Sequence, residues 1–225
     1  MKRDSLKKIA ITSVFTAIAF ILTFIFRFKV SFLTFDFKDA IIAMVALMYG
    51  PLYGVASAGV VAFLEFLSVS DTGLYGLIMN FISSGTFALV FGLVYKYKRT
   101  FTGAILSVIL SVISVTAIMM VANYLITPYY MGVSRGDVVA FIPTLLLPFN
   151  LAKSIINATA TLLLYKPVTN VMKRMGIIKR SEKAIHKYNK KSLVLFIISV
   201  LIIILAIIFI IFKLDGAYEF LPHFK

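Results

Sequence analysis

The sequence of 225 residues contains no cysteine and no tryptophan, and only 14% of its residues are charged. Without cysteine, the chain forms neither a disulfide framework nor a cysteine-ligated metal site. Soluble domains average about 25% charged residues, whereas 61% of this chain is hydrophobic. So apolar a chain would not stay dissolved as a disordered coil. The composition therefore predicts an all-α polytopic membrane protein.

Motifs for catalysis are lacking as well. The chain has no phosphate loop of the pattern Gly-x-x-x-x-Gly-Lys-Ser/Thr, so it is not expected to hydrolyse ATP itself. Its two histidines, His186 and His223, fall in a basic loop and in the C-terminal tail. Neither position suits a buried catalytic dyad or an intramembrane metal. We therefore expect no enzymatic activity, no cofactor and no metal site.

Long hydrophobic runs define the expected helices, because a membrane-spanning helix needs roughly 17–25 mostly apolar residues. Gly50-Pro51 divides one long run in two, since proline lacks a backbone N–H and disfavours helix at the residue before it. Pro148 suits the first turn of another helix. The sequence thus predicts seven helices: Ile9–Phe26, the two halves of Ile41–Phe66, Tyr75–Tyr95, Gly103–Ile126, Pro148–Tyr165 and Ser192–Phe212.

Acidic residues are few: nine stand against 23 lysines and arginines, for a formal net charge of +14. Most basic residues fall in the segments that share one side with the N-terminus. The positive-inside rule therefore predicts a cytoplasmic N-terminus and, with seven spans, an outer C-terminus in a bacterial-type cell membrane. Residues 1–175 would form a six-helix bundle, 176–191 a basic cytoplasmic linker, and 192–225 an additional transmembrane helix with an outer tail. The basic cluster at 166–191 favours anionic membrane lipid over nucleic acid, because it is short and flanked by spans.

Three polar side chains share one face of the predicted helix Pro148–Tyr165. Asn150, Lys153 and Asn157 follow the spacing i, i+3, i+7. A lysine near the bilayer centre costs about 2.5–3.5 kcal/mol on insertion scales, so Lys153 should face the bundle interior and contact a ligand. Two alternatives remain: Lys153 pairs with Glu65, which stands alone in an apolar stretch, or it extends its ammonium toward the outer surface.

Asn80 is isolated in another span. Its amide offers two donors and an acceptor, which suits either the edge of a heterocyclic ligand or a hydrogen bond to a neighbouring helix. The outer connection Lys29–Asp39 alternates apolar and polar residues over Phe32–Lys38. This period predicts an extended, half-buried segment. Irregular backbone at membrane depth needs protein or a cavity to cover it, so the segment could form a lid over a site.

Small residues line one face of the first helix. Ala10, Ser13 and Ala17 are spaced by three and four residues, which lets another helix approach closely. The spacing alone does not distinguish packing inside the bundle from contact with an external partner.

Taken together, four segments resemble the substrate-binding S components of energy-coupling-factor (ECF) vitamin transporters, and most closely the riboflavin-specific members. These are FDFKDA at 35–40, YGPLYGV at 49–55, Asn80 followed by YKYKR at 95–99, and LPFNLAKSIINATATLLLYKPV at 147–168. The resemblance covers roughly residues 5–175. It implies a six-helix membrane bundle that binds the vitamin near the outer surface, under the first outer loop. The helix Ser192–Phe212 is additional to the family's six.

The resemblance also implies roles for individual residues. Asn150 and Lys153 would hydrogen-bond the polar edge of the isoalloxazine ring of riboflavin, and Asn80 would line the same pocket. Asp36 and Asp39 would hold the lid or meet the ribityl hydroxyls. Ala10, Ser13 and Ala17 would dock on a transmembrane coupling subunit, while two ATPase subunits would supply the energy. The candidate substrate-binding set is Asn80, Asn150, Lys153, Asp36, Asp39, Glu65 and Asn157.

Two other functions stay open at this point. One is an S component for a different vitamin, such as thiamine or a folate precursor. The other is an independent secondary carrier driven by protons or sodium, with Glu65 and Lys153 as the coupling pair. A purely structural membrane scaffold would leave Asn150 and Lys153 without effect on binding.

Overall fold

The computed structural model describes residues 2–176, isolated residues between 194 and 208, and the pair 218–219. The predicted linker 176–191 lies outside the described residues except for Gly176, and the predicted helix Ser192–Phe212 lies outside them except for those isolated residues. Five helical segments are long and apolar enough to cross a membrane: Ser5–Ile25, Pro51–Ser68, Gly73–Tyr97, Phe101–Met131 and Arg135–Arg174. The described part is thus a multi-pass helical membrane protein.

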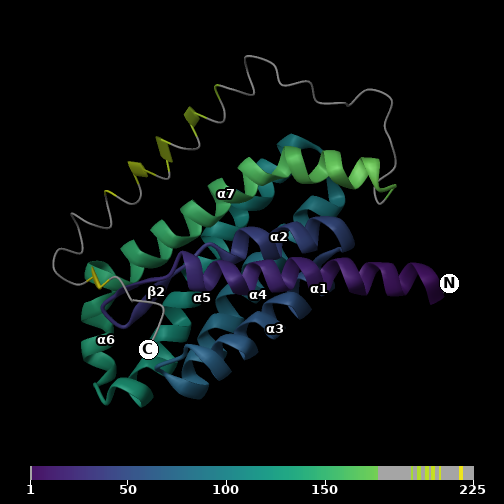
Figure 1. The fold of residues 1–225 in the computed structure, drawn as a ribbon. Coiled ribbons are helices and arrows are strands. Elements are labelled where there is room, and N and C mark those ends of the chain that lie inside the picture. The colour runs from purple at the N-terminus through teal and green to yellow at the C-terminus, as the bar shows by residue number, and fades with distance from the viewer. Residues whose placement is uncertain are drawn as a thin grey trace.

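The helices pack side by side, and a small sheet lies at the end of the bundle away from the N-terminus (Figure 1). In chain order the elements are α1 (Lys2–Ile25), β1 (Phe28–Val30), β2 (Leu33–Phe35), α2 (Lys38–Tyr49), α3 (Pro51–Ser68), α4 (Gly73–Tyr97), α5 (Phe101–Met131), α6 (Arg135–Phe141), the π-helical turn η1 (Ile142–Leu146), α7 (Leu147–Arg174) and β3 (Tyr218–Glu219).

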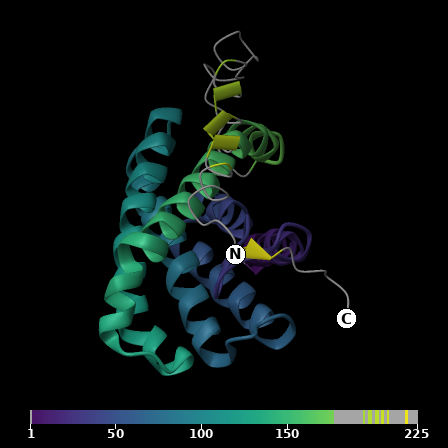
Figure 2. The same ribbon diagram turned by 90° about the vertical axis from the view of Figure 1, so that its left-hand side faces the viewer.

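Helix α2 lies among the other helices (Figure 2). Its 12 residues span only about 18 Å at 1.5 Å per residue, yet nearly all of its side chains are buried. It contacts α1, α3, α4 and α7. The helix ends at Gly50, whose φ of 98° is unfavourable for other residues, and α3 begins at Pro51. The predicted division of Ile41–Phe66 into two helices is confirmed.

The last described helix is longer than predicted at both ends. The sequence predicted its start at Pro148, but the chain is already helical from Arg135. The helix widens into the π-helical turn η1 around Pro143, because proline cannot donate a backbone hydrogen bond. It also continues past Pro167 to Arg174. Packing explains the extension, because Thr169 and Met172 beyond the proline are buried. Tertiary contacts here outweigh the helix-breaking tendency of proline.

The outer connection forms an antiparallel hairpin of β1 and β2. The predicted extended segment Phe32–Lys38 is confirmed at Leu33–Phe35, whereas its last residue, Lys38, begins α2. Val30, Leu33 and Phe35 are buried and pack with the start of α7, where Phe149 and Ile156 lie. Strand β3 pairs with the free edge of β1, giving the order β2-β1-β3. Residues 218–219 therefore lie at the end of the bundle opposite to the N-terminus. Which end faces the cytoplasm stays a prediction.

Candidate functional site

A cavity of about 240 Å³ lies beneath the β1–β2 hairpin, at the same end of the bundle. Side chains from α1, the hairpin, α3, α4, α5 and α7 converge on it. Its apolar wall includes Phe32, Leu33, Met79, Met119, Tyr130 and Phe149, and its polar wall includes Asp36, Lys38, Glu65, Asn80, Asn150 and Lys153. Most of the predicted site residues are therefore brought together in one place.

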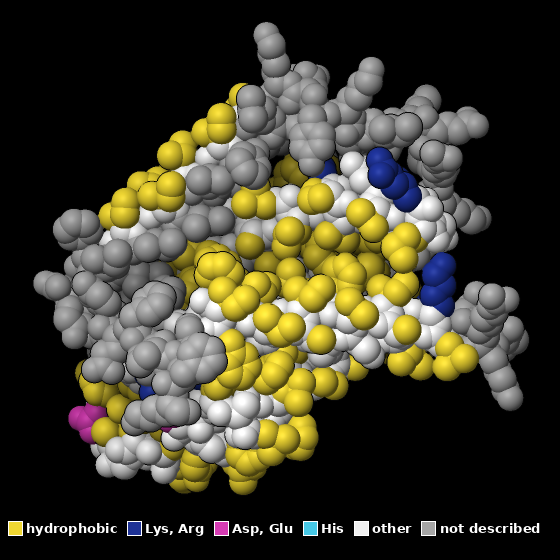
Figure 3. Space-filling view, in the orientation of Figure 1, with side chains coloured by type: hydrophobic (Ala, Val, Ile, Leu, Met, Phe, Trp, Pro, Cys, Tyr) yellow, Lys and Arg dark blue, Asp and Glu magenta, His cyan; other side chains and the backbone are white. Residues whose placement is uncertain are grey.

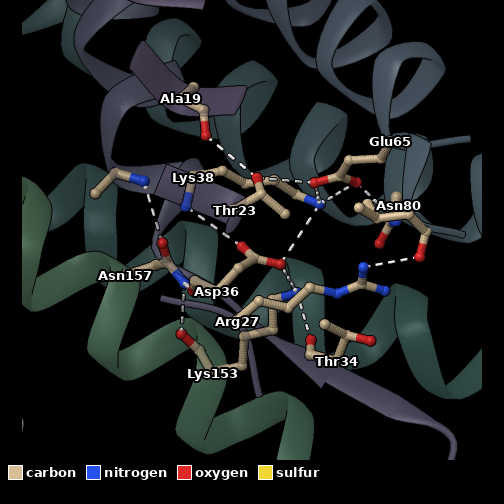
Figure 4. A network of polar contacts seen from close by, with 12 residues as sticks. Ala19, Thr23, Arg27, Thr34, Asp36, Lys38, Glu65, Asn80, Lys153 and Asn157 are labelled. Atoms are coloured by element: carbon tan, nitrogen blue, oxygen red, sulfur yellow. Dashed lines mark hydrogen bonds and ion pairs between the residues drawn. The ribbon is translucent and has the colours of Figure 1, made fainter. Parts of the chain in front are cut away.

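Lys153 turns toward the hairpin. Its Nζ donates to Oδ2 of Asp36 at 2.9 Å and to the backbone oxygen of Thr34 at 3.0 Å (Figure 4). The alternative in which Lys153 pairs with Glu65 is wrong, because Glu65 has a different partner. Lys38, the first residue of α2, takes that place.

Lys38 and Glu65 form a buried ion pair at the site. Lys38 Nζ lies 2.7 and 2.6 Å from the two Glu65 carboxylate oxygens, and both residues are at most 3% exposed. Thr23 Oγ1 donates to Oε1 of this carboxylate at 3.0 Å, and Asn80 Nδ2 donates to Oε2 at 2.8 Å (Figure 4). A buried carboxylate with four donated hydrogen bonds is held in one orientation, so Glu65 fixes the amide of Asn80 at the cavity wall.

The polar wall is electrically balanced. Asp36 also lies 3.5 Å from Lys38 Nζ, so two ammonium groups and two carboxylates alternate in one chain of contacts. Burial by itself would raise the pKa of Asp36, but the charges of Lys153 and Lys38 outweigh it and lower this pKa to about 2. The Asp36 carboxylate is therefore ionised at neutral pH, and the four charges compensate one another out of water.

A signal for Lys38 was present in the sequence. The alternation over Phe32–Lys38 places Asp36 and Lys38 on the same side of an extended segment, opposite to Phe35 and Phe37. Phe35 is fully buried, and the side that carries Asp36 and Lys38 faces the cavity. A buried lysine two residues after a buried aspartate indicates a polar site rather than a solvated loop.

Two predicted site residues do not line the cavity. Asn157 instead ties three segments together: its Nδ2 donates to the backbone oxygen of Asp36 at 2.9 Å, and its Oδ1 accepts from the backbone N–H of Ala40 at 3.2 Å. Asp39 is 3% exposed and lies in the first turn of α2, away from the cavity wall. Asn157 thus acts as a clamp between α7 and the segment leading into α2.

Asn150 does line the cavity. Its Nδ2 donates to the backbone oxygen of Leu146 at 2.8 Å, at the junction of η1 and α7. Its side chain is 4% exposed. The wide π-helical turn just before it shifts the start of α7, which is typical of functional sites.

Polar contacts also join the hairpin to the connection between α3 and α4. Arg27 Nη1 donates to the backbone oxygen of Val69 at 2.7 Å, and Lys29 forms an ion pair with Asp71. All four residues line the cavity. Within residues 5–176, no group of three or more acidic, histidine or cysteine side chains is arranged to hold a metal ion.

Comparison with known proteins identifies the family. Residues 7–165 match the family described as "ECF transporter, substrate-specific component". The chain belongs to this family. As an S component, it is a non-enzymatic transport subunit that pairs with an ECF energising module.

Individual relatives support the assignment to the S components. The chain is 32% identical to "Riboflavin transporter RibU" of Staphylococcus aureus (strain TCH60), over 75% of this chain and 94% of that protein. It is 30% identical to "Riboflavin transporter FmnP" of Bacillus subtilis (strain 168), over 67% of this chain and 85% of that protein. A solved structure described as "Structure and mechanism of the S component of a bacterial ECF transporter" aligns with a TM-score of 0.65 and 30% identity, covering 76% of this chain and 99% of that one.

The small-residue face of α1 is directed outward in this S component. Ala10, Ser13 and Ala17 are all exposed. The opposite face of the helix packs inward, where Thr16 Oγ1 lies 2.7 Å from Ser57 Oγ on α3. Packing inside the described bundle therefore does not use the small residues, and docking of the energising module on them stays a prediction.

Proposed function

We propose that this S component captures riboflavin in the cavity beneath the hairpin and delivers it for ATP-driven uptake. The observation that carries the proposal is the combination of Asn80, Asn150 and Lys153 with an aromatic and methionine wall in one buried cavity. The names of the relatives in Staphylococcus aureus and Bacillus subtilis point to the same vitamin. At about 30% identity, these names support the ligand without establishing it.

The chemistry of riboflavin fits the two walls of the cavity. Its isoalloxazine ring is flat and largely apolar, which suits contact with Phe149, Tyr130 and the two methionines. The pyrimidine edge of the ring carries carbonyls, ring nitrogens and an N–H, which the amides of Asn80 and Asn150 and the ammonium of Lys153 complement. The ribityl hydroxyls would then meet the carboxylate of Asp36.

The size of the cavity implies movement on binding. Its volume of about 240 Å³ falls below the roughly 300–1,000 Å³ typical of small-molecule sites. The hairpin supplies Phe32, Leu33 and Thr34 to the wall, so its displacement would enlarge the cavity. We therefore expect the ligand to enter by shifting the hairpin outward.

Partner subunits would provide the energy. Because the chain lacks a phosphate loop, ATP hydrolysis has to come from two ATPase subunits, coupled through a transmembrane subunit. We propose that this coupling subunit docks on the exposed face of Ala10, Ser13 and Ala17, where small side chains permit close helix approach.

Riboflavin binding is tested directly with the purified full-length chain. We expect a bound yellow, fluorescent flavin, or quenching of added riboflavin fluorescence. Thiamine and a folate precursor should fail to compete. An S component for one of those vitamins would show the reverse order of competition. Absence of both bound flavin and quenching would reject riboflavin as the ligand.

Asn150→Ala tests the site itself. Loss of one buried hydrogen-bonding group costs about 1–3 kcal/mol, so we expect roughly 5- to 150-fold weaker riboflavin binding in a fluorescence titration. Asn123→Ala is the matched control, because Asn123 is buried and donates to the oxygen four residues earlier, at 2.7 Å, without lining the cavity. Equal losses in the two variants would mean a general packing effect, and no loss in either is the result that a structural scaffold predicts.

The ion-coupled carrier has less support. Its proposed coupling residues do not pair with each other, because Glu65 pairs with Lys38 and Lys153 pairs with Asp36. Uptake by vesicles that contain this chain alone, driven by an ion gradient, would nevertheless favour the carrier over the S component.

A further inference from the structure

A second cavity lies at the opposite end of the bundle and is strongly basic. Its volume is about 650 Å³, and its wall includes Lys7 and Lys8 from α1, Lys96 from α4, and Arg99 from the turn between α4 and α5. The lining contains no acidic residue. Among residues 5–176 the carboxylates belong to Asp36, Asp39, Glu65, Asp71 and Asp137, and those at positions 36, 65 and 71 line the cavity at the far end. The cavity therefore attracts anions.

An apolar groove of about 490 Å³ continues from this cavity between α1 and α7. Every residue that lines it is hydrophobic, including Val14, Phe15, Leu164, Val168 and Val171. Met48 lines both the groove and the basic cavity. Figure 3 shows hydrophobic side chains between α1 and α7, with lysine and arginine side chains toward the N-terminal end.

We propose that the groove and the basic cavity together hold one anionic phospholipid. An acyl chain would lie in the groove, and the phosphate would contact Lys8, Lys96 and Arg99. The first turn of α3, which begins at Pro51 beside these side chains, adds the positive end of a helix dipole. Basic pockets between helices on the cytoplasmic side bind anionic headgroups, and the positive-inside rule assigns this end to the cytoplasm.

The combination of the two parts favours a lipid over a protein partner. Ala10 lines this groove and also belongs to the proposed docking face for the coupling subunit, so the lipid is proposed for the chain without that subunit. In that state a helix docked in the groove would bury apolar surface but would not by itself supply counter-charges to the four neighbouring basic side chains. An anionic phospholipid satisfies both parts with one molecule, since its charge sits at the end of its hydrocarbon chain. The proposal does not depend on the identity of the transported vitamin.

The absence of tryptophan makes a quenching experiment direct. Val14→Trp places one fluorophore in the groove at a residue that is 57% exposed, and Ile113→Trp places one on α5 at a residue that is 60% exposed and outside the groove. Each chain is reconstituted in phosphatidylcholine vesicles with an equal, low fraction of brominated phosphatidylglycerol or brominated phosphatidylcholine. We expect brominated phosphatidylglycerol to quench the tryptophan fluorescence of Val14→Trp at least about twofold more strongly than brominated phosphatidylcholine does. The two lipids should quench the fluorescence of Ile113→Trp equally.

Variants that lack basic side chains distinguish a defined lipid site from a general attraction of anionic lipid to the basic end of the bundle. Lys8→Gln with Lys96→Gln removes two charges from the cavity, and Lys98→Gln with Arg174→Gln removes two exposed charges at the same end outside it. The preference of Val14→Trp for phosphatidylglycerol should disappear in the first background and persist in the second. Equal quenching by both lipids, or equal effects of the two double variants, would overturn the proposal and leave the groove to a protein partner.

A second measurement uses the chain without tryptophan. In native mass spectra of the detergent-solubilised protein, we expect one retained phosphatidylglycerol per chain, and its loss in the Lys8→Gln, Lys96→Gln variant. Retention of phosphatidylcholine to the same extent would contradict a site for anionic lipid.

Discussion

At the scale of single residues, the buried charges decide how the cavity is built. Lys38 and Lys153 share the Asp36 carboxylate, and Lys38 also pairs with Glu65. Because each charge of the chain Lys153–Asp36–Lys38–Glu65 has a partner of opposite sign, these four side chains are buried together without an uncompensated charge among them. Their contribution is to orient Asn80 and the hairpin rather than to add net stability.

Replacement of one buried charge should therefore lower the stability more than replacement of both members of an ion pair. We expect Lys38→Met to lower the stability by about 3–5 kcal/mol, because it leaves the buried Glu65 carboxylate uncompensated. Lys38→Met combined with Glu65→Leu should recover most of this loss. Thermal unfolding of the three proteins in detergent is the measurement, and a double variant less stable than Lys38→Met would contradict this account of the network.

At the scale of elements, the position of α2 depends on close packing against α3 and α4. A Cβ added at Gly54 on α3 would lie 2.7 Å from the Cβ of Ala46 on α2 and 3.1 Å from the Cβ of Ala88 on α4. These distances leave no space for a methyl group. Since α2 begins at Lys38, two residues after Asp36, a shift of α2 would also disturb the polar wall of the cavity.

The substitution Gly54→Ala should accordingly lower the melting temperature. Overpacking costs about 1–3 kcal/mol, which exceeds the roughly 1 kcal/mol that alanine gains over glycine in a helix. Gly59→Ala on the same helix is the control, because its Cβ would meet only Phe81, at 3.4 Å. Its melting temperature should stay equal or rise. If both variants behaved alike, the close approach of α2 and α3 would not limit stability.

At the scale of the whole molecule, the strand β3 joins the C-terminal region to the site. Residues 218–219 pair with Lys29 and Val30 of β1, and β1 belongs to the hairpin that covers the cavity. Two segments almost 190 residues apart in sequence are thus held by backbone hydrogen bonds.

Truncation tests the pairing. Removal of all residues after 216 should accelerate hydrogen exchange of the β1 amides at positions 29 and 30, since it exposes the edge that β3 covers. Truncation after residue 220 keeps β3 and should leave exchange at these positions unchanged. Mass-spectrometric hydrogen exchange on the ligand-free proteins measures both. Identical exchange in the two truncated chains would exclude the pairing.

The local pattern of the sequence was sufficient for the membrane class, the break at Gly50-Pro51 and the extended outer segment. These features depend on the run lengths of apolar residues, on the missing N–H of proline and on a two-residue period, all of which are local. The spacing of Asn150, Lys153 and Asn157 also predicted one polar face correctly. It could not indicate that Asn157 holds the segment leading into α2 while the other two line the cavity.

What the sequence by itself determined is therefore the membrane class and the polar residues that lie within the apolar helices, whereas seven spans were predicted and five candidate spans are found among the described residues. Only the tertiary structure decided the partners of those residues, because a charge pair such as Lys38 with Glu65 joins helices that are adjacent in space at a separation of 27 residues. The same holds for the basic cavity, which α1 and α4 form together at one end. Spacing along a helix fixes the face on which a side chain lies, but the packing of helices fixes what that face contacts.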